Sequence, residues 1–510
     1  MSSAEPLFHR HDSSTLTLRR LGIDTYQEAV IYMDRECGVC RAEGFTAQSR
    51  VRVSLGPKEV IATLNVVTGG LLQQGEAGLS ESAWQALDAQ EGAQVEVSHP
   101  EPIESLSALR AKVYGHRLEL PAWRQMMADV VSGRYSDLHL AALVTACAGD
   151  RLDIEETVAL TRAMIEQGQR LSWSAPVVAD KHCVGGLPGN RTTLIVVPIV
   201  AASGLTIPKT SSRAITSPAG TADTMEVLAP VDLSLEHMRR VVERTGGCLA
   251  WGGRVQLSPA DDRLIRVERP LDLDSEGQLV ASVVSKKVAA GSTHIVIDMP
   301  VGPTAKVRSQ AAAVALRERL ERVGAALGVN IRVHLSDGTQ PVGRGIGPAL
   351  EARDVLSVLR GEPAGPADLR DRSLRLAAEV ISFARGVDPG IARQTAETLL
   401  ASGAAWRKFQ EICEAQGGMH TPPRAALTRE VRAERDGTCL AIDNRRIARV
   451  AKLAGAPRAA AAGVELQVSV GEPVLRGQPL YTIHAEAPGE LDYSLAYALS
   501  QHDIFSLGEP

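Results

Sequence analysis

The sequence predicts an α/β protein with added helical and β domains. Hydrophobic residues first form short alternating runs and then follow helical spacing. Strands and helices alternate after that, and short β runs return near the end. The length of 510 residues also exceeds that of an ordinary single domain. We therefore expect a small N-terminal β domain, a helical lobe, an α/β lobe and a C-terminal domain of helical linker and β structure (α+β), at 1–97, 98–175, 176–386 and 387–510.

Composition narrows the class of protein. Hydrophobic residues make up 44% of the chain and charged residues 23%, so a sizeable core is possible. The net charge of −5 argues against general binding to nucleic acid or to a membrane surface. No run of eighteen apolar residues predicts a membrane span, and the first residues lack the features of a signal peptide. Seven cysteines in this length favour a reducing cytoplasm.

The N-terminal segment reads as a β domain. Alternating runs at 16–18, 51–55 and 60–67 are separated by glycine and proline. Cys37 and Cys40 form a Cys-x-x-Cys pair, but no second Cys or His pair follows at zinc spacing, so we interpret them as ordinary cysteines near a turn.

The following segments alternate in character. Helical spacing runs through 104–169, where Asp153 begins a capping-box-like start. Strands and helices alternate from 176 to about 386, and the glycine-rich segment 336–351 is open to two interpretations, a functional loop or a plain connection. Residues 387–430 are predicted to be helical, short strands are expected from about 437, and the linker 456–463 is expected to be flexible.

Two loops rich in glycine and hydroxyl side chains mark the candidate site. The first contains Gly185, Gly186 and Gly189, between a strand-like segment at 176–179 and a helix-like run at 194–202. Such a turn at a helix N-terminus lets backbone amides approach an anion. The second places two cations and five hydroxyls around a Pro-Ala-Gly turn: Lys209, Ser211, Ser212, Arg213, Thr216, Ser217 and Thr221.

These loops lack the common nucleotide-binding fingerprints. Neither the Walker pattern nor the dinucleotide pattern is present. We therefore expect the anion to be free phosphate or the phosphate of a substrate. An ordinary solvated turn is the alternative for either loop alone, and two basic loops so close together make that alternative less favoured.

Two motifs resemble the signature of the thymidine phosphorylase family. The first reads Lys-His-x-x-Gly-Gly from Lys181, and the second reads Ser-x-Arg, six variable residues and Gly-Thr-x-Asp-x-x-Glu from Ser211. The turn at 186–190 is more similar to the long branch of the family, which holds archaeal AMP phosphorylases and long bacterial chains. The resemblance implies a barrel-like N-terminal domain, a phosphate-binding α/β lobe that forms the catalytic cleft with the helical lobe, and a homodimer or larger homo-oligomer.

The resemblance also implies a phosphate site. His182 falls where the thymidine branch has a proton source or base contact. Cys183 stands where the family mostly has serine, and this departure removes one expected hydroxyl contact. The expected phosphate contacts are Lys181, Gly186, Thr193, Ser211 and Thr221.

The base and sugar contacts differ between the branches. The thymidine pattern matches Ser282 and Lys286, whereas its arginine is matched poorly, because Arg269 precedes a proline and lies too close to Asp274. The AMP pattern makes Asp274 the proton donor, and Lys209 is a candidate by charge for a 5′-phosphate. The AMP pattern places substrate contacts on Gly186, Ser212, Arg213, Ala214, Ile215, Thr216, Ser217, Thr221, Ser282 and Lys306.

The expected activity is phosphorolysis of an N-glycosidic bond. The resemblance implies that thymidine and phosphate yield free base and deoxyribose 1-phosphate. The alternative is an AMP phosphorylase that releases ribose 1,5-bisphosphate. No metal or cofactor is expected, and phosphate is a co-substrate. Two alternatives belong to other functional classes. One is a transferase that uses phosphoribosyl pyrophosphate and magnesium, and the other is a non-catalytic nucleotide-binding protein.

Overall fold

The computed structural model describes residues 15–214, 217–253, 255–271, 273, 275–501 and 503–509, without the side chain of Arg269. The chain folds into two compact units. One comprises Met1–His116 and Gln125–Ala146, and the other comprises Arg117–Arg124 and Cys147–Pro510. Each unit is described by itself.

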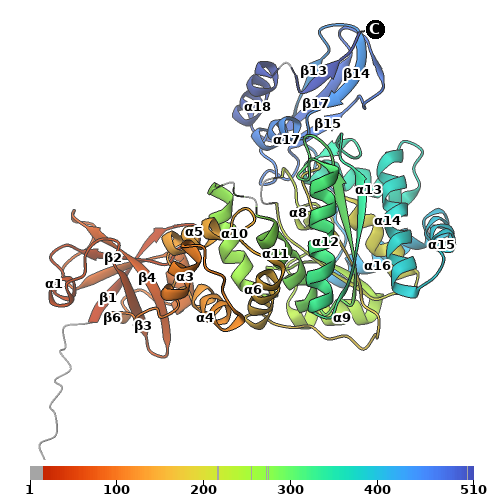
Figure 1. Ribbon diagram of the computed structural model, residues 1–510. Helices are drawn as coiled ribbons and strands as arrows, with labels where there is room; N and C mark the ends of the chain where they lie inside the picture. Colours follow the sequence, from red (N-terminus) through yellow and green to blue (C-terminus); the bar gives the residue numbers. More distant parts are fainter. Residues whose placement is uncertain are drawn as a thin grey trace, which may run out of the picture. The chain divides into compact units, whose positions relative to one another are not determined.

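The first unit contains a closed six-stranded barrel, which confirms the predicted N-terminal β domain (Figure 1). The alternation of buried and less buried side chains along the strands explains why a barrel forms. In β3, Val51 and Val53 are fully buried, whereas their neighbours are not. Closure leaves no exposed strand edge. The strands pair in the order β1 (Thr15–Ile23), β5 (Glu76–Ser80), β2 (Val30–Asp34), β4 (Lys58–Val67), β3 (Arg50–Leu55) and β6 (Gln94–Ser98).

Cys37 and Cys40 lie in the barrel core, at the short helix α1 (Gly38–Glu43). Burial, with the neighbouring Cys37 adding to it, raises the pKa of Cys40 to about 12, so its thiol stays protonated. All seven cysteines are free. Among the described residues, no three His, Cys, Asp or Glu side chains are grouped as a metal ion would require.

Helices follow the barrel in the chain. Asp153 caps α6 as predicted, because its Oδ1 accepts from the amide of Glu156 at 2.7 Å. The Glu156 carboxylate accepts from Leu118 N at 2.9 Å. These helices are α3 (Leu106–Val113), α4 (Leu120–Val131), α5 (Asp137–Ala146) and α6 (Ile154–Glu166), whereas α2 (Glu81–Leu87) lies between the barrel strands β5 and β6.

The second unit is built on parallel strands. β10 (His294–Val301) pairs with β7 (Ala179–Cys183) on one side and β11 (Asn330–Asp337) on the other. A bridge between Val178 and Thr206 continues this sheet to the parallel pair β8 (Ile207–Ser211) and β9 (Gly247–Trp251).

Helices cover both faces of this sheet (Figure 1). Val296 of β10 belongs to one hydrophobic core, and its neighbours Ile295 and Ile297 belong to the other. The α/β prediction is therefore confirmed. The first core includes α7 (Thr192–Ala202), α13 (Pro348–Arg360), α14 (Ala367–Arg385), α15 (Pro389–Ala401) and α16 (Ala404–Gln416), and the second includes α11 (Glu276–Ala289) and α12 (Gln310–Ala326).

The C-terminal part combines two small sheets with helices, as the α+β prediction requires. One sheet has the order β12-β15-β17-β13 and the other β16-β14-β18. The elements are β12 (Gly345–Ile346), β13 (Leu427–Arg432), β14 (Gly437–Ile442), α17 (Asn444–Leu453), β15 (Gly463–Leu466), β16 (Pro473–Val474), β17 (Pro479–Ala485), α18 (Pro488–Ser500) and β18 (Phe505–Leu507).

Two local expectations need correction, and the structure adds one fact about segment 336–351. Helix does not continue to residue 430, because α16 ends at Gln416 and the largely exposed strand β13 pairs with β17. The linker 456–463 is packed rather than loose, since Ala461 and Ala462 are buried. In segment 336–351, Gly345 and Ile346 form β12 and pair with β15.

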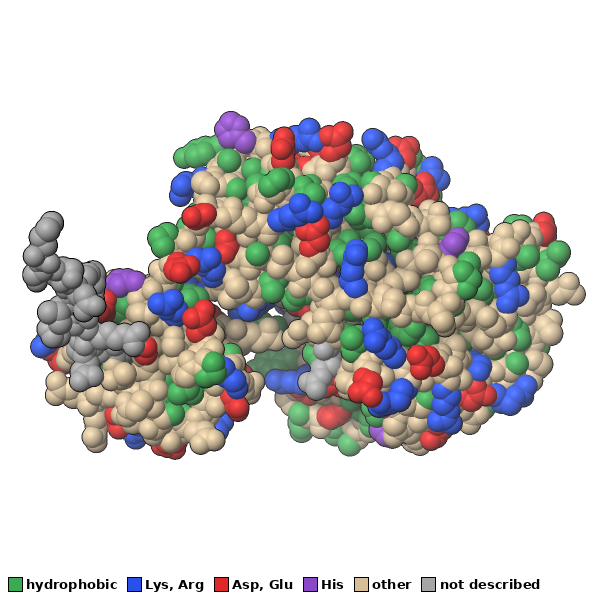
Figure 2. All heavy atoms as spheres, turned by 90° about the horizontal axis from the view of Figure 1, so that it is seen from below, with side chains coloured by type: hydrophobic (Ala, Val, Ile, Leu, Met, Phe, Trp, Pro, Cys, Tyr) green, Lys and Arg blue, Asp and Glu red, His purple; other side chains and the backbone are tan. Residues whose placement is uncertain are grey.

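No helix in the described part of the chain is long and apolar enough to cross a membrane. Acidic and basic side chains are interspersed on the face of the second unit seen in Figure 2, in keeping with the small net charge.

Gly463→Ala should destabilise the protein. Gly463 has φ +153°, and a Cβ there would lie 2.0 Å from the carbonyl oxygen of Ile346, so β12 and β15 must separate. The matched control is Gly471→Ala, where φ is +91° but the space is open. Calorimetry should show a Tm for Gly463→Ala on the order of 3 °C below that of the control. Equal Tm values would contradict this packing.

Candidate functional site

The first anion loop connects β7 to α7. Gly185, Gly186 and Gly189 all have positive φ, of +93°, +79° and +71°. A Cβ at Gly186 would lie 2.5 Å from Lys306 N, and one at Gly189 would lie 2.1 Å from Val342 O. Backbone therefore packs directly against backbone on two sides of the loop. The loop delivers the N-terminus of α7 to the carboxyl end of the sheet, where its amides can meet an anion.

Lys181 lies beneath this loop and is completely buried. Its Nζ donates to Thr192 Oγ1 at 2.8 Å and to Thr193 Oγ1 at 3.3 Å. Burial lowers the pKa of Lys181, and the nearby Cys183 and Asp298 oppose that effect. The ammonium is thus held against two hydroxyls at the first turn of α7.

Asp298, on β10, supplies the buried negative charge. It accepts from Asn190 Nδ2 at 3.0 Å and from Ser336 Oγ at 2.5 Å. Burial alone would raise the pKa of Asp298, but Lys181 and Arg372 outweigh burial and lower it. The carboxylate therefore stays ionised beside Lys181.

The second anion loop is folded by one carboxylate. Asp223 Oδ2 accepts from Ala214 N at 2.6 Å and from Gly220 N at 2.8 Å, which closes the turn before α8 (Thr221–Glu226). A Cβ at Gly220 would lie 2.6 Å from Ala214 N, so only glycine fits. Ser211 Oγ is buried without a hydrogen-bond partner among the described residues, as expected for a hydroxyl that serves a ligand.

Arg191 brings the two loops together. It directly precedes α7, and its Nη1 donates to Thr221 Oγ1 at 3.2 Å. Of the predicted phosphate contacts, Lys181 and Thr193 are bonded to each other, and Arg191 connects the start of α7, where Thr193 lies, to Thr221.

The predicted substrate run 212–217 is only partly described. Arg213 forms ion pairs with Glu226 and Asp223 and lies over the Trp251 ring, with 4.9 Å from Cζ to the ring centroid. Its hydrogen bond to Glu226 outweighs burial and raises the pKa of Arg213. Ser212 is exposed, Ala214 is buried and Ser217 Oγ donates to Ala219 O at 2.9 Å. Ile215 and Thr216 lie outside the described residues.

Two predicted base contacts share one turn of α11. Lys286 Nζ lies 3.4 Å from Ser282 Oγ and 2.5 Å from Asp261 Oδ2, at the start of α10 (Pro259–Leu271). Burial works against the charge of Lys286, but Asp261 outweighs it and raises the pKa of Lys286. A hydroxyl and a fixed cation on one face can recognise carbonyl oxygens of a base.

Lys306 and Asp274 are two further predicted site residues, and the structure describes only the first of them. Lys306 lies against Gly186, next to the first anion loop. Asp274, predicted as a proton donor, lies outside the described residues, as does the side chain of Arg269.

Asp180 and two lysines form a buried cluster behind β7. Asp180 Oδ2 lies 2.9 Å from Lys287 Nζ, and Asp180 Oδ1 lies 3.8 Å from Lys209 Nζ. Lys209 is only 3% exposed and donates to Thr210 O at 2.5 Å. In this structure Lys209 is thus paired within the protein, and its contact with a substrate 5′-phosphate stays a prediction.

His182 faces these cations from the end of β7. Burial, followed by the charges of Lys287, Lys209, Lys286 and Lys181, holds the pKa of His182 well below its ordinary value of 6.5. A neutral imidazole can donate one N–H hydrogen bond, but it cannot act as an imidazolium acid at neutral pH.

Four buried residues of the site were missed by sequence reasoning: Asn190, Arg191, Asp298 and Glu351. Asn190 and Arg191 lie between the last glycine of the first loop and Thr192, where their position in the motif could have marked them. Glu351 pairs with Arg191 across 160 residues, a relation with no sequence signal.

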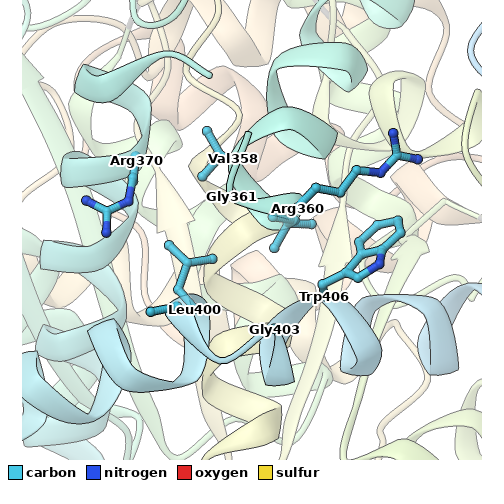
Figure 3. Close-up of a pocket in the computed structure, with 9 residues that line it drawn as sticks. Val358, Arg360, Gly361, Arg370, Leu400, Gly403 and Trp406 are labelled. Atoms are coloured by element: carbon cyan, nitrogen blue, oxygen red, sulfur yellow. The ribbon is translucent and has the colours of Figure 1, made fainter. Parts of the chain in front are cut away.

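The described part of the chain also has a cavity of about 300 Å³ beside the ends of α13 and α15 (Figure 3). Arg360 extends over Trp406, with 4.9 Å from Cζ to the ring centroid. None of the residues that line this cavity belongs to the predicted site.

His182 should stay neutral between about pH 6 and pH 8 in the free protein. The unfolded chain gains a proton at this residue as the pH falls through about 6.5, whereas the folded chain does not. His182 therefore lowers stability only below that pH. Nuclear magnetic resonance of the imidazole, assigned with His182→Gln, measures the titration.

Lys286→Met provides the comparison for this titration. It removes one facing cation and should move the titration of His182 to higher pH. Ordinary titration near pH 6.5 in the unsubstituted protein would contradict the prediction.

Comparisons with known proteins agree with this architecture. Residues 106–168 match the glycosyl transferase family helical bundle domain, and residues 175–406 match the glycosyl transferase family a/b domain. Residues 439–504 match the pyrimidine nucleoside phosphorylase C-terminal domain. Anthranilate phosphoribosyltransferase from Thermus thermophilus shares the fold, with a TM-score of 0.51, 21% identity and coverage of 61% of this chain and 99% of that one.

Close relatives extend over nearly the whole chain. A protein from Polaromonas sp. (strain JS666) named "Putative thymidine phosphorylase" is 66% identical, with 95% of each chain covered. "Putative thymidine phosphorylase 1" from Acidovorax sp. (strain JS42) is 61% identical, with 98% of each chain covered. "Putative thymidine phosphorylase" from Legionella pneumophila (strain Corby) is 58% identical, with 97% of this chain and 96% of that one covered. The chain therefore belongs to the thymidine phosphorylase family and is a pentosyltransferase of the nucleoside phosphorylase type.

Proposed function

We propose that the protein catalyses phosphorolysis of thymidine to thymine and 2-deoxyribose 1-phosphate. The observation that carries this proposal is the pair of anion loops. Buried Lys181 is fixed to hydroxyls at the start of α7. The second loop supplies the hydroxyl of Thr221 and that of Ser211, which has no hydrogen-bond partner among the residues the structure describes. The names of the relatives support the choice of thymidine.

The phosphate side would act through position and charge. A phosphate oxygen forms the new bond to C1′ as the bond from C1′ to N1 of the base breaks, and the bonding electrons leave with the base. Lys181, Thr193, Ser211 and Thr221 are the proposed phosphate contacts, together with the amide of Gly186. Preorganised donors of this kind lower the barrier without reorganising during the reaction.

The base side would stabilise the departing pyrimidine. Ser282 and Lys286 are the proposed contacts to its carbonyl oxygens, and Asp261 holds the ammonium of Lys286 in place. The neutral imidazole of His182 adds an N–H donor. The negative charge that develops on the base is thus met by one cation and two hydrogen-bond donors.

AMP phosphorolysis is the second candidate. It is favoured by the contact between Gly186 and Lys306, because both match the AMP pattern. Lys209, the candidate contact for a 5′-phosphate, is buried and donates to Thr210 O, so the AMP candidate requires that this bond be exchanged for one to the substrate.

Base release should depend strictly on inorganic phosphate and should be fastest with thymidine. A panel of nucleosides and nucleoside 5′-monophosphates, analysed by chromatography of the released base, measures both properties. Lys286→Met should lower kcat/KM for thymidine by on the order of a hundredfold, because a cation facing the developing charge is lost. Lys408→Met is the matched control, since Lys408 pairs with Glu411 on the surface of α16.

Other results would reverse the assignment. Equal base release without phosphate would indicate a hydrolase. Preferred turnover of AMP would indicate the second candidate, for which Asp274→Asn should lower kcat by about a hundredfold or more through loss of a general acid.

A further inference from the structure

Arg191 is held in a fixed position by three acceptors. Its side chain is 11% exposed, and its Nε donates to the carboxylate of Glu351. Its Nη1 donates to Thr221 Oγ1 at 3.2 Å, and its Nη2 donates to Ala219 O at 2.9 Å. Because a guanidinium is planar and rigid, three partners fix both its position and its orientation.

Glu351 is held as firmly as its partner. Its side chain is fully buried in the first turn of α13. Oε2 also accepts from Thr224 Oγ1 at 3.0 Å, and Oε1 accepts from Gly347 N at 3.2 Å. The ion pair therefore holds the first turn of α8 at Thr221 through the guanidinium and at Thr224 through the carboxylate.

The direction of the bond to Thr221 determines what its hydroxyl can do. A hydroxyl has one donor proton and two lone pairs. Since Arg191 donates to Thr221 Oγ1, it occupies a lone pair and leaves the hydroxyl proton available to another acceptor. A phosphate oxygen is a strong acceptor of this kind.

The same pair connects the site to the C-terminal sheet. Gly347 directly follows β12, in which Ile346 pairs with Val464 of β15. The amide of Gly347 donates to the carboxylate of Glu351, which also binds Arg191. The edge of the C-terminal sheet and the two anion loops thus share one buried ion pair.

We propose that Arg191 and Glu351 are a positioning pair for phosphate. The pair directs the Thr221 hydroxyl proton toward the bound phosphate and sets the spacing between the N-termini of α7 and α8. Neither residue touches the reacting atoms. This inference rests on the proposed phosphorolysis, because it takes phosphate as the ligand of Thr221.

Arg191→Lys and Glu351→Gln should weaken phosphate binding selectively. Lysine cannot serve the three acceptors at once, and glutamine leaves the guanidinium buried without a counter-charge. The Kd for inorganic phosphate, from isothermal titration calorimetry, and the KM for phosphate should rise at least about tenfold. The kcat at saturating phosphate and the KM for the nucleoside should change less than about threefold. Arg332→Lys, which alters a half-exposed pair with Glu379, should leave all four values unchanged.

A double-mutant cycle with Thr221→Val separates positioning from a merely structural role. If Arg191 acts through Thr221, Arg191→Lys should weaken phosphate binding much less in the Thr221→Val background than in the unsubstituted protein. If Arg191 has only a structural role, Arg191→Lys should instead lower the Tm and leave the Kd for phosphate unchanged in the folded protein. The effects of the substitutions at Arg191 and Thr221 should then be independent of each other. If Arg191→Lys does not fold, Arg191→Gln takes its place in the cycle.

The two proposals can fail separately. Phosphate binding without turnover in the unsubstituted protein would overturn the proposed function, and selective loss of that binding in the variants would still support the pair. Turnover with an unchanged Kd for phosphate in the folded variants would overturn the pair alone. Absence of phosphate binding in the unsubstituted protein would overturn both.

Discussion

Positive charge buried at the carboxyl end of the parallel sheet is the constraint on which the second unit depends. Lys181 is completely buried, and an ammonium removed from water is costly unless its charge and its protons are satisfied. The hydroxyls of Thr192 and Thr193 accept hydrogen bonds from the ammonium of Lys181, and Asp298 supplies the negative charge from the neighbouring strand. The register of β7 against β10 sets this arrangement, since Cys183 is opposite Asp298 and Val296 is opposite Lys181.

The same principle operates behind β7. Asp180 points away from the first anion loop and faces Lys209 and Lys287, so that neighbouring residues of one strand serve two separate charge clusters. Adjacent residues of a strand point to opposite faces of the sheet, which explains how a short motif supplies both. Asp180 and Lys181 are therefore required for the packing of the sheet, in addition to belonging to a candidate binding site.

Close backbone packing keeps the loops of the site in place. Positions 186, 189 and 220 must be glycine, because a Cβ at each would overlap backbone atoms of another segment or, at Gly220, of the same loop. Further glycines have the same role at the C-terminal sheet, where Gly347 packs against Ala462 O. Asn444 adds a side-chain contact, with its Nδ2 donating to Thr304 Oγ1 and Gly338 O at 3.0 Å each. The C-terminal part is thus tied to the segment at Thr304, two residues before Lys306, which packs against Gly186 of the first anion loop.

The sequence by itself determined the fold class and the location of the anion loops. Periodicity distinguishes strands from helices because side chains alternate on a strand and repeat every three or four residues on a helix. The glycines and hydroxyls of the two loops are local signals that are visible without a structure. Local pattern failed at β13, whose polar, exposed residues resemble a helix end, and at 456–463, where small residues proved to be buried.

Only the tertiary structure decided which charged residues are buried and which of them pair. Lys209 belongs to a basic loop in the sequence, but in the structure it is buried beside Asp180. Arg191 and Glu351 are 160 residues apart and meet only because α7 and α13 pack in one core. Burial and pairing depend on long-range packing, so the chemistry of a charged residue cannot be predicted from its neighbours in the chain.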